Sequence, residues 1–240
     1  MTPENPNDTP KQHKVIFFDL DHTLWDYELN SAETLRELYE HHRLQERGVT
    51  SHEHFLKEFQ TVNAALWVLY DQGLIDSDVI RKERFKKVLT PFGAYEEKLC
   101  YDISHEYLHT CPQKGNLIPH AFEVLTYLKK HYQLTVITNG FEEIQHLKLA
   151  SGNLQHFFDH VVTSQKAGHK KPRKEIFDYA LDLNGIKHHE AVMVGDNLVT
   201  DIGGARNAGV EAVYFNPERV RHESTPDYEI ASLHELYAIL

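Results

Sequence analysis

Two aspartates, Asp19 and Asp21, follow directly on the apolar run from Val15 to Phe18. The run combines two β-branched and two aromatic side chains, which predicts a strand that is buried on both faces. Ligands of open α/β sheets bind at the carboxyl ends of strands, so both carboxylates are expected at a binding edge. Two like charges this close are costly unless they share a cation, and carboxylate oxygens suit a hard metal ion. Alternatively, the aspartates only terminate the strand, because Asp is common in turns.

A second predicted strand ends in Thr138, Asn139 and Gly140. A hydroxyl, an amide and a flexible backbone at the start of a helix are groups that hold an anion. Further along the chain, Lys171 supplies a basic point charge, and Pro172 restricts the backbone beside it. Simpler roles are open for two of these side chains, with Thr138 as a helix cap and Lys171 as a solvated surface charge.

A fourth predicted strand is followed by Asp196 and Asn197, and Asp201 comes five residues after Asp196. Parallel strands present their carboxyl ends at one edge of the sheet, so these groups are expected near Asp19 and Asp21. Asp201 is also suited to cap the helix that follows, and that role is compatible with a place in the site.

The elements that must position these groups follow from the apolar pattern. After residue 119, short buried strands alternate with single helices, which predicts right-handed βαβ units and a mostly parallel sheet. The predicted strands are 134–138, 160–163, 191–195 and 211–215. The predicted helices extend to about residue 130 and over 142–150, 174–183 and 200–208.

Between the first strand and residue 111 the pattern is helical throughout. Asn30 or Ser31 is expected to cap the first helix and Ser51 the second, with further helices near 77–90 and 94–110. A helical block inserted after the first strand must lie over the carboxyl end of that strand. We therefore expect a cap above the site.

The chain is thus expected to divide into a Rossmann-like α/β core, a helical cap and a tail. The core comprises residues 14–24 and 115–240, and the all-helical cap comprises residues 25–114. Residues 1–13 are rich in Pro, Asn and Thr and are predicted to form a flexible tail.

Composition excludes several classes of function. The 240-residue chain has a formal net charge of −11, which disfavours binding to long nucleic acids because such binding requires Lys and Arg against the phosphates. A small anionic substrate remains compatible if a metal and a few cations dominate the site. No apolar run approaches the roughly 20 residues that cross a bilayer, and the N-terminus lacks a basic segment followed by an apolar one. We expect a cytoplasmic protein with no membrane contact.

Cysteine and histidine spacing gives no metal-site signature. Cys100 and Cys111 are expected to be reduced and buried. The chain has 18 histidines, but the neighbouring pairs lack the i, i+4 spacing of a helical zinc site. A structural zinc site is therefore not expected.

The joint pattern is similar to the four motifs of the haloacid dehalogenase (HAD) superfamily, and this resemblance covers essentially the whole chain after the tail. The matching residues are Asp19, Asp21, Thr138, Lys171, Asp196 and Asp201. The resemblance implies that Asp19 is the nucleophile that forms an aspartyl-phosphate, and that Asp21 is the general acid and base. The dehalogenase branch lacks this second acid, so the presence of Asp21 favours phosphate chemistry.

The same resemblance implies the remaining contacts of the site. Thr138 and the backbone amides of Asn139 and Gly140 bind the phosphoryl oxygens, and Lys171 neutralises the developing charge. Mg²⁺ is the implied cofactor. Its implied ligands are Asp19, the backbone carbonyl of Asp21 and Asp196, with Asp201 and Asn197 in support.

The helical insertion resembles the superfamily branch that carries a small helical cap. Within that branch, the segment from Asp21 to Asp26 and the pair Arg84-Phe85 are similar to pyrimidine 5'-nucleotidases of the YjjG type. So is a set of cap residues with helical spacing, Asn63, Trp67 and Tyr70. An amide and two aromatic rings on one helix face can hold a base, although such a stripe is more often bundle core. Trp25 is a candidate for the pocket floor or, equally, for a hinge anchor.

We therefore predict a Mg²⁺-dependent phosphomonoesterase that acts on a small phosphorylated metabolite, most specifically a 5'-nucleotidase for pyrimidine nucleoside monophosphates. A sugar-phosphate phosphatase or a phosphomutase uses the same core and also needs the second acid. A non-catalytic phosphate-binding regulator is a third alternative, which the presence of both Asp19 and Asp21 disfavours. The sequence makes no prediction of oligomeric state.

Overall fold

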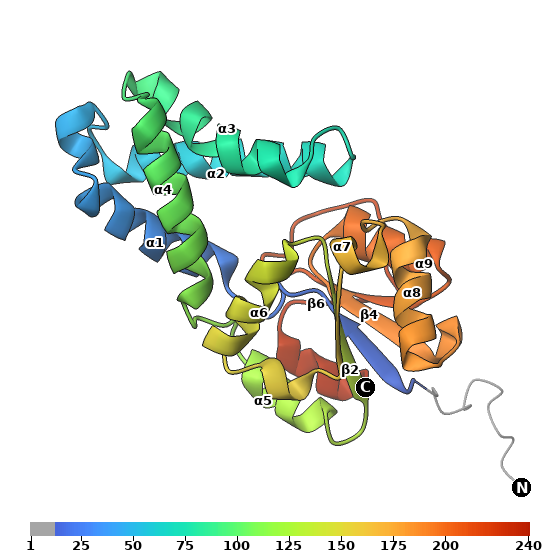
Figure 1. Ribbon diagram of the computed structural model, residues 1–240. Helices are drawn as coiled ribbons and strands as arrows, with labels where there is room; N and C mark the ends of the chain where they lie inside the picture. Colours follow the sequence, from blue (N-terminus) through green and yellow to red (C-terminus); the bar gives the residue numbers. More distant parts are fainter. Residues whose placement is uncertain (1–12) are drawn as a thin grey trace, which may run out of the picture.

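A parallel six-stranded sheet forms the centre of one half of the protein (Figure 1). The computed structural model describes residues 13–240. The strands in spatial order are β3 (His160–Thr163), β2 (Gln133–Thr138), β1 (Val15–Phe18), β4 (Ala191–Gly195), β5 (Glu211–Phe215) and β6 (Tyr228–Ile230). All five neighbouring pairs are parallel, which confirms the predicted α/β class. The short strand β6 was not predicted, because three residues are too few to show a period.

Strand β1 lies at the centre of the sheet and is buried on both faces, as its composition predicts. Ile16 and Phe18 join the larger apolar cluster on one face, while Val15 and Phe17 join a second cluster on the opposite face. Because successive side chains of a strand point to opposite faces, four apolar residues in a row serve two cores at once. The strand therefore delivers Asp19 from a rigid base.

Helices cover both faces of the sheet (Figure 1). The α-helices that flank it are α5 (Ala121–Leu128), α6 (Glu142–Ser151), α7 (Ser164–Ala167), α8 (Lys174–Asn184) and α9 (Gly204–Asn207). The predicted helix at 200–208 instead begins at Leu198, as the π-helix η6 (Leu198–Gly203). The Asn197 side chain accepts hydrogen bonds from the amides of Val199 and Thr200, so this residue caps the helix two residues early.

Four longer helices stand apart from the sheet (Figure 1). They are α1 (Tyr27–His41), α2 (His52–Asp71), α3 (Ser77–Leu89) and α4 (Glu97–Thr110). The expectation that Asn30 or Ser31 caps α1 was wrong. Asp26 is the cap, because its carboxylate accepts a hydrogen bond from the Leu29 amide, and Asn30 and Ser31 lie buried inside the helix. The prediction of Ser51 as the cap of α2 is confirmed.

Two connecting segments join the four helices to the sheet, and they are bonded to each other. The backbone of Trp25 forms an antiparallel bridge to Leu117, and its indole N–H donates to the carbonyl of Lys114 over 2.9 Å. The amide of Asp26 donates to the carbonyl of Asn116 over 3.1 Å. Entry and exit of the helical segment thus run side by side.

Three further predictions concern the chain as a whole. Residues 1–12 of the predicted tail lie outside the described residues, whereas His13 lies 2.7 Å from the carboxylate of Glu211. Cys100 and Cys111 are buried free thiols. Within residues 13–240, no helix is both long enough and apolar enough to span a membrane.

The two faces of β1 can be tested separately. We expect Phe17→Ala and Phe18→Ala each to lower the free energy of unfolding by about 3 to 5 kcal/mol, since each leaves a cavity in a different core. Phe122, which is 41% exposed, provides the matched control, and Phe122→Ala should have a much smaller effect. Urea denaturation measures all three. Equal effects at the three positions would contradict the assignment of β1 as the central strand.

Candidate active site

The floor of the site is a buried cluster of one amine and two carboxylates. The Nζ atom of Lys171 lies 2.5 Å from Oδ1 of Asp19 and 2.6 Å from Oδ1 of Asp201. Lys171 is only 2% exposed. Asp19 follows β1 and Asp201 lies in η6 after β4, so the two neighbouring strand ends meet at this amine, as the sequence predicted.

Gly195 allows Asp201 to enter this cluster. A Cβ atom at position 195 would lie 2.3 Å from Oδ2 of Asp201, so only glycine leaves room for the carboxylate. The backbone amide of Asn197 donates to the same Oδ2 over 3.0 Å. Two features at the end of β4 therefore orient Asp201. Gly195 leaves room for its carboxylate, and the backbone amide of Asn197 binds it.

Asp196 completes a group of three carboxylates with Asp19 and Asp201. One carboxylate oxygen from each lies within 4.8 Å of the other two. The hydroxyl of Thr23 donates to Oδ1 of Asp196 over 3.0 Å and holds it in this position. Asn197, which the sequence placed in support of a metal, uses its side-chain oxygen to cap η6.

The electrostatics of the cluster follow from three acids that face one buried amine. Burial raises the pKa of Asp19, and the nearby charges of Asp201 and Asp196 raise it further, against the opposing effect of Lys171. Burial and the charge of Asp201 raise the pKa of Asp196 to about 7. Although burial alone would lower the pKa of Lys171, the charges of Asp19 and Asp201 raise it above its ordinary value. The cluster as a whole thus favours additional positive charge.

The loop after β2 contributes Thr138, Asn139 and Gly140. The amide of Gly140 donates to the hydroxyl of Thr138 over 2.9 Å. The Asn139 side chain accepts from the amide of Lys171 and donates to the carbonyl of the same residue, and it also donates to the carboxylate of Asp71. Asn139 therefore fixes the loop that carries Lys171 and connects it to α2.

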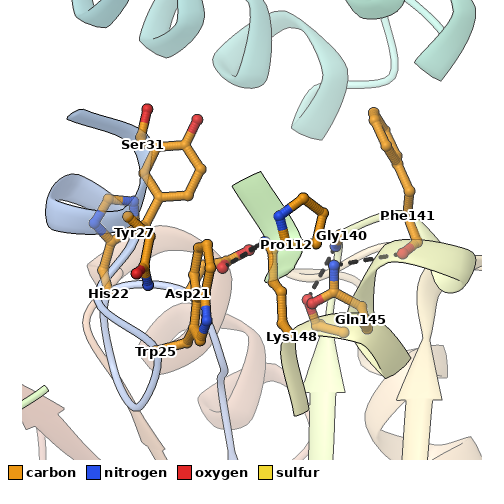
Figure 2. A network of polar contacts seen from close by, with 12 residues as sticks. Asp21, His22, Trp25, Tyr27, Ser31, Pro112, Gly140, Phe141, Gln145 and Lys148 are labelled. Atoms are coloured by element: carbon orange, nitrogen blue, oxygen red, sulfur yellow. Dashed lines mark hydrogen bonds and ion pairs between the residues drawn. The ribbon is translucent and has the colours of Figure 1, made fainter. Parts of the chain in front are cut away.

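The side chain of Asp21 points toward Lys148, a residue that sequence reasoning did not identify (Figure 2). The two carboxylate oxygens of Asp21 lie 2.6 and 2.7 Å from Nζ of Lys148. The amine also lies 4.6 Å from the centre of the Trp25 ring. Lys148 lies in the last turn of α6, 127 residues after Asp21, and no local motif marks it.

Gln145, one turn before Lys148 in α6, is a second residue that sequence reasoning missed. It is 1% exposed, and its Oε1 atom has no hydrogen-bond partner among the described residues. Figure 2 shows Gln145 next to Gly140. A Cβ atom added at Gly140 would lie 2.2 Å from Nε2 of this side chain. The predicted flexible glycine is thus needed for close packing against Gln145.

A cavity of about 310 Å³ lies above the floor, between the sheet edge and the four helices. Its walls include Asp19, Asp21 and Lys171 from below, and Asn63 and Trp67 from α2. The carboxylates, the loop after β2 and all four helices of the four-helix group therefore face a single space.

The four predicted pocket residues divide into two groups. Asn63 and Trp67 line the cavity, and the Trp67 ring stacks on Phe141 with 5.4 Å between ring centres. Tyr70 packs edge-on against Trp67, outside the cavity wall. Trp25 is fully buried in the connecting segments and does not line the cavity. Its position corresponds to the hinge-anchor alternative.

The chain is similar in sequence to known proteins along nearly its whole length. The sequence model of the haloacid dehalogenase-like hydrolase family matches residues 16–215. The chain is 32% identical to the pyrimidine 5'-nucleotidase YjjG of Escherichia coli, over 94% of this chain and 96% of that protein. It is 30% identical to the human N-acylneuraminate-9-phosphatase, over 95% and 93%. A crystal structure of the HAD-hydrolase YfnB from Bacillus subtilis, bound to magnesium, has a TM-score of 0.86 and 27% identity, covering 95% of this chain and 99% of that one.

The raised pKa of Asp196 predicts a pH dependence of stability. Between about pH 4, where an aspartate of the unfolded chain titrates, and about pH 7, Asp196 binds more protons in the folded protein than in the unfolded chain. Asp196 therefore makes the metal-free protein less stable as the pH rises through 7. We expect urea denaturation in EDTA to give a lower free energy of unfolding at pH 8 than at pH 5.5. Asp196→Asn should reduce this difference, and the exposed control Asp178→Asn should preserve it.

Identical pH dependence in the wild type and in Asp196→Asn would contradict this origin. The Asn substitution retains an oxygen that can accept the hydrogen bond from Thr23, so a loss of folding is not expected from that contact.

Proposed function

We propose that this chain hydrolyses phosphate monoesters through an aspartyl-phosphate on Asp19. The chain belongs to the haloacid dehalogenase-like hydrolase family and is a phosphatase of that family. The observation that carries the proposal is the pairing of Asp19 with the buried amine of Lys171 at the floor of the cavity. An anionic nucleophile approaches a phosphate only when cations offset the repulsion between them.

In the proposed reaction, a carboxylate oxygen of Asp19 attacks phosphorus and the bond to the ester oxygen breaks. Asp21 donates a proton to the departing alkoxide, which leaves as an alcohol. Water then attacks the phosphorus of the aspartyl-phosphate, and Asp21 takes a proton from this water. Inorganic phosphate leaves, and the carboxylate of Asp19 and the protonated Asp21 are restored. Thr138, the amides of Asn139 and Gly140, and Lys171 hold the phosphoryl oxygens during both steps.

Lys148 is proposed as the residue that positions Asp21 between the two steps. Both oxygens of Asp21 accept from its amine, an arrangement that suits the ionised carboxylate that must take a proton from water. The amine is almost completely buried, so its charge also adds to the cations that face an incoming phosphate.

Mg²⁺ is the proposed cofactor. The carboxylates of Asp19, Asp196 and Asp201 have oxygens within 4.8 Å of one another and face the single amine of Lys171. They form an oxygen-rich donor set with excess negative charge, which fits this ion. Asp19, Asp196 and the backbone carbonyl of Asp21 would hold it, with Asp201 in support. When bound, Mg²⁺ neutralises charge on the nucleophile and on the phosphoryl group.

The proposed cap consists of residues 25–114, which open and close over the phosphoester, and residues 14–24 and 115–240 form the core. The cavity between α2 and the sheet edge supports this division, as does the pair of connecting segments bonded through Trp25. The similar YfnB structure is described as revealing interdomain movement.

For the substrate we propose pyrimidine nucleoside monophosphates. The similarity to YjjG along nearly the whole chain supports this choice, and so does Trp67 in the cavity wall, which offers an aromatic ring. Asn63 also lines the cavity, but its amide is hydrogen-bonded to Arg84 and Tyr27. Similar identity to N-acylneuraminate-9-phosphatase supports a sugar-acid phosphate as the second candidate.

Phosphate release from a panel of monoesters tests the proposed function. With Mg²⁺ present we expect release from UMP, dUMP, dTMP and CMP to exceed release from purine monophosphates and sugar phosphates, and we expect EDTA to abolish it. Asp19→Asn should reduce turnover to background, because an amide cannot act as the nucleophile. Preference for a sugar-acid phosphate would replace the nucleotidase assignment, and no release from any ester would overturn the phosphomonoesterase proposal.

The two roles of Asp21 predict a particular mutant phenotype. Asp21→Asn should slow both protonation of the leaving group and hydrolysis of the intermediate, each by about 10²-fold or more. Rapid-quench measurement of the phosphorylated protein, together with steady-state turnover, separates the two steps. The exposed control Asp178→Asn should behave as wild type. Unchanged turnover in Asp21→Asn would refute the assigned role.

A further inference from the structure

The roof of the cavity contains a buried arginine for which residues 13–240 supply no counter-ion. Arg84 of α3 is 2% exposed and lines the same cavity as Asp19 and Lys171. Among residues 13–240 its guanidinium has one hydrogen-bond partner, the side-chain oxygen of Asn63, which lies 3.1 Å from Nη1. The Nε and Nη2 atoms have none. Burial of a charged donor without an acceptor is unfavourable, and such groups concentrate where a ligand completes them.

Aromatic rings hold the guanidinium in place. Its central carbon lies 4.5 Å from the ring centre of Tyr107, 5.3 Å from that of Phe59 and 5.5 Å from that of Phe85. Cation–π contacts stabilise the charge through the face of the guanidinium plane. They leave the N–H groups at its edge unsatisfied. The side chain is thus fixed in orientation while part of its hydrogen-bonding capacity stays free.

Nε and Nη2 of Arg84, which have no hydrogen-bond partner among residues 13–240, can donate to two adjacent acceptors. The N–H of Nε and the outward N–H of Nη2 point in parallel from one edge of the guanidinium, the edge that binds a carboxylate with two hydrogen bonds. The third nitrogen, Nη1, is already bonded to Asn63. The partner that completes Arg84 must therefore present two acceptors side by side.

Asn63 itself is committed to the protein. Its oxygen accepts from Arg84, and its nitrogen donates to the hydroxyl of Tyr27 over 3.0 Å. That hydroxyl lies 3.1 Å from the hydroxyl of Tyr107, which in turn lies 3.0 Å from the hydroxyl of Ser31. This chain of hydrogen bonds joins α1, α2, α3 and α4, and it positions Arg84 before any ligand binds.

We propose that Arg84 is a second anchoring point of the cavity, which binds two adjacent hydrogen-bond acceptors on the alcohol part of the phosphate ester. The proposal rests on the proposed function, since the phosphoryl group occupies the floor at Asp19 while the rest of the substrate extends toward α3. Two chemical sources present such a pair: the carboxylate of a sugar acid, and the O2 and N3 atoms of cytosine. Uracil presents N3–H in place of the second acceptor and does not match the arginine edge.

Two matched substrate pairs test the proposal. 6-Phosphogluconate and sorbitol 6-phosphate differ by a carboxylate, and CMP and UMP differ at the base edge. We expect the wild type to prefer the first member of at least one pair by roughly 10-fold or more in kcat/KM. The pair that shows the preference identifies the source of the acceptors. Phenyl phosphate, which has no such acceptors, reports the hydrolytic step alone.

Arg84→Met should abolish the preference, so that the kcat/KM values within each substrate pair become similar. Arg84→Lys keeps the charge but has no paired edge, so it should also lose most of the preference, even if the methionine variant fails to fold. Lys82→Met, which removes a highly exposed charge from the same helix, is the control and should retain the preference. Thermal denaturation checks the folding of each variant.

A binding measurement separates failure of this inference from failure of the proposed function. Gluconate and cytidine are the dephosphorylated forms of 6-phosphogluconate and CMP. Gluconate should raise the melting temperature of the wild type more than sorbitol does, or cytidine more than uridine does. Arg84→Lys should lose this difference. That result would support the anchor even if no ester is hydrolysed. The proposed role of Arg84 would be overturned if neither substrate pair showed a preference and no difference in melting temperature were found. It would also be overturned by a preference that survives both Arg84 substitutions.

Discussion

The buried amine of Lys171 is the interaction on which the rest of the site depends. It is shared between Asp19 and Asp201, so it connects the end of β1 with the turn after β4. Removal of one partner from a buried ion pair typically costs about 3 to 5 kcal/mol, which makes this contact a strong constraint on both strand ends. Asn139 adds a third element, because it binds the backbone of Lys171 on both sides of the residue.

Much of this arrangement is predictable from the sequence because it depends on local order along the chain. The run Val15 to Phe18 can be satisfied only by a strand with two buried faces, and the end of such a strand fixes where Asp19 lies. The alternation of short strands and helices then leaves few topologies other than a parallel sheet. Because its strand ends share one edge, Lys171 and Asp201 had to approach Asp19 even though 152 and 182 residues separate them from it in the chain.

The features of the structure that were not predicted depend on tertiary contacts, and such contacts leave no pattern in the nearby sequence. Lys148 lies within a helix, where a basic residue is ordinarily a solvated surface group, and only the packing of other segments buries it. Arg84 was singled out as half of the pair Arg84-Phe85, but that pair gave no indication that packing would bury its guanidinium in the cavity wall. The start of α1 was misplaced for a related reason. Asn30 has the side chain of a good cap, but it is used in a tertiary contact with Asn116, and Asp26 is the residue that meets the free amides.

The hydrogen bond between Asp26 and Asn116 has a consequence for how the fold accommodates variation. The helical segment between these residues leaves the sheet and returns to it at adjacent points, so the bonds at this junction do not involve the interior of the segment. The entropy of closing such an excursion grows only slowly with its length. The junction can therefore accommodate a helical insertion of different length, because the hydrogen bonds that close it join only the two ends of the insertion.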